Sequence, residues 1–173
     1  MSLDFERLML PHLDAAYRLA VAMVRDEAAA QDIVQDSYLK AWRSWWRFIP
    51  GNEKAWLLTI VRRRALTWLK GVRHGEVAAD DEDLTAADQA HLSVAADQEA
   101  AIIAGQSGLR VRAALARLAA PLREVIVLRD FEDMAYKDIA RVLEVPVGTV
   151  MSRLARGRES LRAILVKDGH GGM

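Results

Sequence analysis

The segment AYKDIARVLEVPVGTVMSRLARGR, residues 135–158, constrains the fold of this chain more than any other stretch. Apolar residues recur at helical spacing on both sides of Val145, which predicts two short helices joined by a tight turn. Ala140 is small enough to let the two helices cross closely, and Pro146 suits a first helical position because it lacks an N–H. The expected buried residues are Ile139, Ala140, Leu143, Val150, Leu154 and Leu161. The segment therefore predicts a helix-turn-helix.

Burial of those residues would leave a polar face on the second helix. Hydroxyl and guanidinium groups would then point outward together, from Thr149, Ser152, Arg153 and Arg156. A helix that enters the DNA major groove needs such side chains to reach base edges and phosphates. The alternative is an ordinary helical hairpin whose basic face is only solvated. We favour DNA binding.

Charge is sorted along the chain, although the formal net charge is zero. Counted from the sequence, residues 1–36 carry −4, 37–75 carry +8, 76–107 carry −8 and 108–173 carry +4. Two basic blocks separated by an acidic block suggest two nucleic-acid surfaces and a spacer that phosphate repels.

The composition excludes several classes of protein. With no cysteine, the chain has no disulfide, thiolate metal site or cysteine nucleophile, and its four histidines are too scattered to share a metal. No Gly-rich phosphate loop or nucleophile–base arrangement is visible, so we expect neither enzymatic activity nor a cofactor. The apolar stretches are short and the N-terminus is acidic, so we expect no membrane insertion and a cytoplasmic location.

Hydrophobic periodicity predicts an all-α fold with two small helical domains. We expect helices through residues 5–24 with a start or kink at Pro11, through about 28–46, and through about 53–70. Further helices should follow near residue 97, with an interruption at 105–108 and a new start at Pro121. The domains would span 1–74 and 97–173, joined by a flexible acidic linker at 75–96.

All five tryptophans fall between positions 42 and 68, inside the most basic block. Aromatic faces and cations together hold single-stranded nucleic acid. We expect Trp42 and Trp68 to be core residues. Trp45 and Trp46 are adjacent, so at least one should be exposed, and the consecutive arginines at 62–64 must partly face solvent or phosphate.

Three segments resemble the extracytoplasmic-function (ECF) branch of the bacterial sigma-70 family. They are AAAQDIVQDSYLKAWR at 28–43, NEKAWLLTIVRRRALTWLK at 52–70 and LREVIVLRDFEDMAYKDIARVLEVPVGTVMSRLARGRESLR at 122–162. The resemblance implies that the first domain is sigma region 2 and the second is sigma region 4. It further implies a transcription initiation factor whose partners are core RNA polymerase, promoter DNA and an anti-sigma factor.

The resemblance also assigns roles to residues. Docking on the coiled coil of the polymerase β′ subunit falls to Asp32, Gln35, Asp36 and Lys40. Recognition and melting of the −10 element fall to Asn52, Trp56, Arg62, Arg63 and Arg64. Reading of the −35 element falls to Thr149, Ser152, Arg153, Arg156 and Arg158, and region 4 is also expected on the flap of the β subunit.

Some positions depart from the family pattern. The common Arg-Asn-Arg of the third helix is Arg62-Arg63-Arg64, and an acid often found shortly afterwards is Thr67. Met151 and Ala155 replace residues that often help to contact DNA. These changes leave the promoter sequence open. In the family the linker threads the RNA exit channel, whereas a solvated spacer explains its composition equally well.

Two other functions remain alternatives. One is a helix-turn-helix regulator that binds duplex DNA without joining polymerase, which would need a dimer surface and a sensor domain. The other is a helical adaptor that binds an acidic partner.

Overall fold

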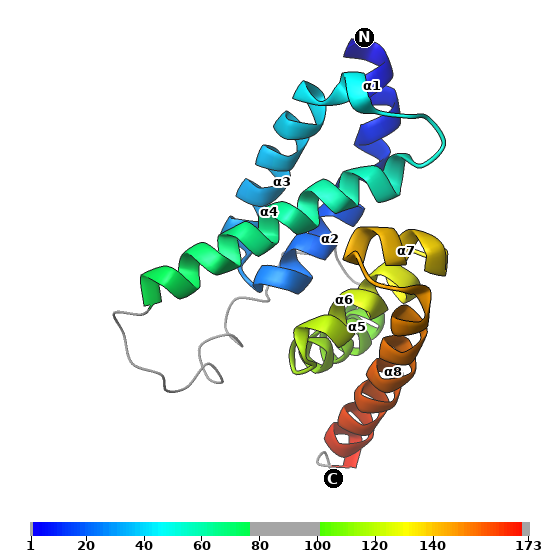
Figure 1. The fold of residues 1–173 in the computed structure, drawn as a ribbon. Helices are drawn as coiled ribbons and strands as arrows, with labels where there is room; N and C mark the ends of the chain where they lie inside the picture. The colour runs from blue at the N-terminus through cyan, green and yellow to red at the C-terminus, as the bar shows by residue number, and fades with distance from the viewer. Residues whose placement is uncertain (1, 77–100, 171–173) are drawn as a thin grey trace.

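The computed structural model describes residues 2–76 and 101–170, and every regular element in these ranges is helical (Figure 1). The predicted all-α fold class is confirmed. The expected linker at 75–96 lies outside the described residues, except for its first two positions. The first range contains α1 (Ser2–Met9), η1 (Leu10–His12), α2 (Leu13–Val24), α3 (Glu27–Arg43), η2 (Trp45–Arg47) and α4 (Glu53–Glu76). The second contains α5 (Ala101–Ala116), α6 (Ala120–Ile126), η3 (Val127–Phe131), α7 (Tyr136–Leu143) and α8 (Val147–His170).

Small side chains set the packing of the first helical domain. The long helix α4 lies against α2 and α3, which also contact each other. Ala16, Ala20, Ala30 and Ala65 are fully buried, so the helix backbones approach closely. Leucines and methionines fill the remaining space, and the polar Ser37 is buried because its hydroxyl donates to the Ile33 carbonyl at 2.6 Å.

Local signals explain where the first helices begin and end. Pro11 lies in the 3₁₀ turn η1 between α1 and α2, which confirms the expected break in the first helix. Arg25 takes the left-handed conformation (φ 54°) that ends α2. Asp26 then caps α3, since its carboxylate accepts the Ala29 N–H at 2.9 Å.

The helix-turn-helix of the second domain has the expected buried face. Ile139, Leu143, Val150 and Leu154 are buried, whereas Ala140 and Leu161, which were also expected inside, are only partly buried against the core. The turn between α7 and α8 places Glu144 in the left-handed region (φ 56°). Pro146 lies one residue before α8 and not at its first position, and its carbonyl accepts the Val150 N–H at 3.2 Å.

The expected interruption at 105–108 is absent, because α5 runs without a break through all four positions. A glycine inside a helix lowers its stability by only about 1 kcal/mol, so a helix can continue through such positions. Pro121 does open α6, as expected.

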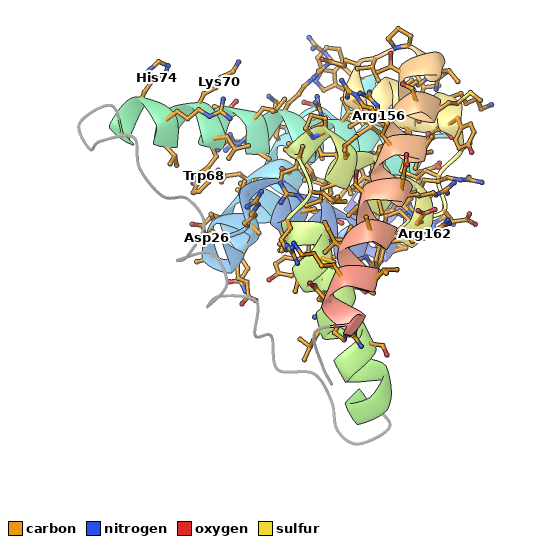
Figure 2. All side chains as sticks on the ribbon, turned by 90° about the horizontal axis from the view of Figure 1, so that it is seen from below. Asp26, Trp68, Lys70, His74, Arg156 and Arg162 are labelled. Carbon is orange, nitrogen blue, oxygen red and sulfur yellow. The ribbon has the colours of Figure 1, made fainter. Side chains whose placement is uncertain are left out.

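The two helical domains pack directly against each other. Helix α7 contacts α4, while α6 and the π-helical segment η3 contact α2. Figure 1 shows α7 beside the N-terminal half of α4, with α8 leading away from it. The other end of α4, which carries Lys70 and His74, extends away from the second domain (Figure 2).

The α6–α8 contact predicts a position that tolerates no side chain. A Cβ at Gly157 would lie 2.9 Å from Cδ1 of buried Ile126 and 3.3 Å from the Leu122 carbonyl oxygen. We expect Gly157→Val to lower the free energy of unfolding by about 1–3 kcal/mol. Urea unfolding followed by circular dichroism measures this change.

The matched control is Gly108→Val in α5, where an added Cβ meets nothing within 4 Å. This variant should change stability by less than about 0.5 kcal/mol. Equal losses in the two variants would contradict the close approach of α6 and α8.

Candidate nucleic-acid interface

The outward face of α8 carries the predicted recognition residues. Ser152 and Arg156 are exposed, and Thr149 and Arg153 are partly exposed. The Arg156 side chain lies back along the helix, where its Nε donates to the Ser152 carbonyl at 3.4 Å. Among the described residues, neither Arg153 nor Arg156 forms an ion pair with a carboxylate. This face is therefore open to an anionic ligand.

Arg158 lies apart from that face. Its guanidinium donates to Asp130 of η3, with 3.1 Å from Nε to Oδ2, and the pair raises the pKa of Arg158. Two residues along a helix turn a side chain by about 200°, so Arg158 and Arg156 point to opposite sides. The structure thus groups four of the five predicted −35 residues and ties the fifth to the body of the domain.

The three consecutive arginines of α4 all contact carboxylates. Arg62 Nε lies 3.2 Å from a Glu124 carboxylate oxygen, and Arg63 donates to Glu144; both acids belong to the second domain. Arg64 contacts Asp36 on α3 within the first domain. Arg63 is nevertheless 62% exposed, so the expectation that these arginines partly face solvent is confirmed.

The start of α4 is engaged by the second domain in the same way. Asn52 Nδ2 lies 3.3 Å from Asp138 Oδ1 of α7. Lys54 Nζ donates to the Glu132 carbonyl at 2.7 Å and lies 3.1 Å from its carboxylate. Arg18 of α2 donates to the same carboxylate.

Glu132 is the buried centre of this contact, with a side chain only 3% exposed. Burial alone would raise its pKa, but hydrogen bonds from Arg18 and Lys54, together with their charges, lower the pKa below its ordinary value. The local backbone explains its position. The π-helical hydrogen bond from the Glu132 N–H to Val127 and the left-handed Asp133 (φ 51°) turn the chain just after η3.

Aromatic side chains form a cluster beside the loop that precedes α4. Trp45 stacks on Phe48 at 4.6 Å between ring centroids, and Trp56 contacts Phe48 at 5.1 Å. Trp56 is therefore partly buried beneath the loop. Trp46 is 74% exposed, which confirms the expectation for the adjacent pair, and the Arg47 guanidinium lies 4.5 Å from its ring centroid.

The two tryptophans that were expected in the core, Trp42 and Trp68, differ in burial. Trp68 is partly buried and packs against the core, on the inner side of α4 (Figure 2). The expectation for Trp42 was wrong, because this side chain is 39% exposed, although its ring contacts Phe5 at 5.1 Å between centroids. Tyr38 and Trp45 also contact the Phe5 ring, at 6.4 and 5.2 Å between centroids.

The predicted polymerase-docking residues share the exposed face of α3: Asp32, Gln35, Asp36 and Lys40. Beside them lies a groove of about 730 Å³ between the start of the chain and α3. Gln35 lines this groove together with exposed apolar side chains, Leu10, Leu13, Leu39 and Trp42. Sequence reasoning missed these four. Leu39 could have been found, since it follows Gln35 by four residues on the same helical face.

Residues 2–76 and 101–170 lack two kinds of feature, a membrane-spanning helix and a cluster of metal-ligating side chains. No helix there is long and apolar enough to cross a membrane. No three side chains of the metal-ligating types gather there into a possible metal site.

Both helical domains match models of the same family. Residues 8–74 match "Sigma-70 region 2" and residues 108–161 match "Sigma-70, region 4". The fold and these matches define a sigma factor of the sigma-70 class, which is a non-enzymatic subunit for transcription initiation.

Comparison with individual relatives places the chain more narrowly. It is 33% identical over 162 residues to the RNA polymerase sigma-H factor of Pseudomonas aeruginosa, covering 91% of this chain and 83% of that protein. It is 31% identical over 172 residues to the ECF RNA polymerase sigma factor SigE of Mycolicibacterium smegmatis, covering 95% of this chain but only 62% of SigE. The chain belongs to the ECF family of sigma-70 factors.

Two solved structures share the whole fold. One is the sigma factor RpoE in complex with the anti-sigma factor NepR from Bartonella quintana, with a TM-score of 0.80, 27% identity and coverage of 94% of this chain and 96% of that one. The other is CnrH in complex with the cytosolic domain of CnrY, with a TM-score of 0.67, 25% identity and coverage of 97% and 91%.

The lowered pKa of Glu132 predicts an acid-sensitive contact between the domains. A carboxylate with a folded pKa below its unfolded value of about 4.3 stabilises the fold above that value. The stabilisation is lost as the pH falls through the folded pKa. We expect the free energy of unfolding to fall from about pH 5 downward, and to fall less steeply in Glu132→Gln.

Urea unfolding at a series of pH values measures this effect. At neutral pH the variant should be less stable than the wild type by about 1–3 kcal/mol, because Arg18 and Lys54 lose the negative charge that pairs with them. Parallel pH profiles for the two proteins would contradict the assignment.

Proposed function

We propose that this ECF sigma factor binds core polymerase through α3, reads the −35 element with α8 and opens DNA at the −10 element with the start of α4. The observation that carries this proposal is the open basic face of α8 on a helix-turn-helix, in a chain whose other domain is of the region 2 type. A cytoplasmic location follows from that role.

For the −35 element, the face of Thr149, Ser152, Arg153 and Arg156 supplies hydroxyl and guanidinium donors at the spacing of a helix in the major groove. Arg158 points elsewhere and is held by Asp130. We infer that it contacts phosphate or stabilises the domain, and that it does not read bases.

For the −10 element, the proposed residues surround the loop before α4. Asn52 directly precedes the helix, with Arg62, Arg63 and Arg64 about three turns further on. We add Trp46, whose exposed ring is suited to stack on an unpaired base. Trp56 supports the loop from within the aromatic cluster.

For polymerase, the exposed face of Asp32, Gln35, Asp36 and Lys40 is the proposed contact with the β′ coiled coil. The adjacent groove supports this role, since exposed apolar side chains around a polar residue are typical of a protein interface. Region 4 is proposed to sit on the β flap. An anti-sigma partner is proposed from the two similar sigma factors solved with one.

Two assays test the proposal. The tagged chain should co-purify with core polymerase, and it should direct run-off transcription from a promoter selected from random templates. A regulator that acts without polymerase would bind duplex DNA but would not co-purify. An adaptor would do neither.

A substitution on α8 tests the reading of the −35 element. Arg156→Ala should weaken binding of the holoenzyme to its promoter by about 1–3 kcal/mol if the side chain reads a base. Arg162→Ala is the matched control, because Arg162 is exposed on α8 beyond the recognition face (Figure 2). Fluorescence anisotropy on matched and scrambled −35 sequences measures both. Equal losses on the two sequences would show that Arg156 touches only phosphate.

A second substitution tests the stacking role of Trp46. Trp46→Ala should raise the activation free energy of strand opening by about 1–3 kcal/mol and so slow it. Trp46→Phe should retain most of the rate, because it keeps an aromatic face. Permanganate footprinting of the melted segment measures the rate. Opening at the wild-type rate in Trp46→Ala would exclude the stack.

A further inference from the structure

An apolar row runs along α8 beside the polar recognition residues. Val147, Met151 and Ala155 succeed one another at intervals of four residues, so they share one side of the helix. Val147 is 41% exposed and Met151 is 53% exposed, and Ala155 is exposed as well. We call these three residues the apolar row of α8. A single exposed apolar side chain is ordinary, but three in succession form a surface.

The core of the second domain does not use the apolar row. Among the described residues of α8, the hydrophobic side chains that pack on the core are Val150, Leu154, Leu161 and Ile164. Each residue turns a helix by about 100°, so Met151 is turned away from Val150, the buried residue that precedes it. The row therefore faces outward.

The apolar row borders the recognition face. Ala155 lies about 60° around the helix from Ser152, and Met151 lies about 40° beyond Ala155. A helix with its side chains is about 10–12 Å wide and the major groove is about 12 Å wide, so the groove encloses the flank of the helix as well as its outermost line. Met151 also lies in the N-terminal part of α8, and this is the part of a recognition helix that contacts base edges.

Arg158 marks where this side of α8 leaves the DNA. It follows Met151 by seven residues, on the same side of the helix but about two turns further along. There its guanidinium is held by Asp130 of η3. The part of this side that can face a base is therefore the apolar row itself.

Hydrogen-bonding groups of the recognition face are partly engaged with the helix backbone. Ser152 Oγ donates to the Thr149 carbonyl at 3.1 Å, and Arg156 Nε donates to the Ser152 carbonyl at 3.4 Å. Readout of bases also uses apolar contacts, and the apolar group that base pairs present in the major groove is the C5-methyl of thymine. The apolar row thus has one chemically matching target on duplex DNA.

We propose that Met151, supported by Val147 and Ala155, contacts thymine methyl groups of the −35 element and so sets a preference for thymine there. The proposal rests on the proposed function of α8. The methionine side chain is unbranched, flexible and polarizable, so it can adapt its shape to a methyl group in the groove. A cation at position 151 would instead favour phosphate, which carries no sequence information.

Deoxyuridine tests the contact, because it pairs as thymine does and lacks only the C5-methyl. The holoenzyme of the full chain and core polymerase is bound to a promoter selected from random templates, and each thymine of the −35 element is replaced in turn. Fluorescence anisotropy should show binding weakened about three- to five-fold at one or more of these thymines, as expected for the loss of one buried methyl group.

Variants of Met151 assign the contact to this side chain. Met151→Ala should weaken binding to the thymine probe by at least about three-fold, and deoxyuridine should then make no further difference at the contacted position. Met151→Leu should retain most of the thymine preference, because it keeps an apolar side chain of similar volume.

The matched control is Val166→Ala on the same helix. Val166 is 53% exposed, as Met151 is, and lies about four turns further along α8. This variant should leave both the affinity and the effect of deoxyuridine unchanged. Circular dichroism checks that all the variants retain their helices.

Three outcomes would overturn the proposal: a selected −35 element without thymine, equal binding to thymine and deoxyuridine probes, or a deoxyuridine effect that persists in full in Met151→Ala. A row that contacts polymerase would also overturn it, since Met151→Ala would then reduce co-purification and weaken binding equally on every sequence. Failure of the proposed function looks different, because the chain would not co-purify with core polymerase and no upstream sequence would be selected.

Discussion

The arrangement of this protein depends on one buried carboxylate, Glu132, held between Arg18 and Lys54. Burial makes the pairing obligatory, because a carboxylate out of water without a cation is strongly disfavoured. Glu132 directly follows the π-helical segment η3, and the left-handed Asp133 turns the chain after it, so the local backbone fixes the position of Glu132. The acids of the second domain therefore lie against cations of the first, and α7 contacts α4 beside the residues proposed to face the promoter.

The two proposed DNA surfaces consequently differ in how their arginines are paired. The recognition face of α8 is open, and its two arginines have no carboxylate partner among the described residues. On α4, Arg62 is largely buried against Glu124, while Arg63 contacts Glu144 but stays 62% exposed. The exposed loop with Trp46 and the groove beside Gln35 stay accessible.

Local features of this fold could be predicted from the sequence, and features that join distant residues could not. The helix-turn-helix follows from spacing within 24 residues, and the buried positions of Ile139 and Leu143 agree. The consecutive arginines at 62–64 were recognised as basic, but their partners lie up to 81 residues away, and no local pattern indicates a pair across that separation. The same limit applies to Arg18 and Glu132, which are 114 residues apart. Trp42 was misjudged because helical spacing does not show which aromatic residue is covered, and the helix through 105–108 because glycine lowers helix stability without ending the helix.

The most direct measurement tests whether Glu132 holds the two domains together in solution. Asn52 and Asp138 touch across the contact, and a chain without native cysteine allows a single pair of introduced cysteines at these positions. A bis-maleimide would then link the two domains when they are in contact. The account predicts fast linking in the otherwise wild-type chain and markedly slower linking once Glu132→Gln is added. Equal rates of linking in the two proteins would contradict it.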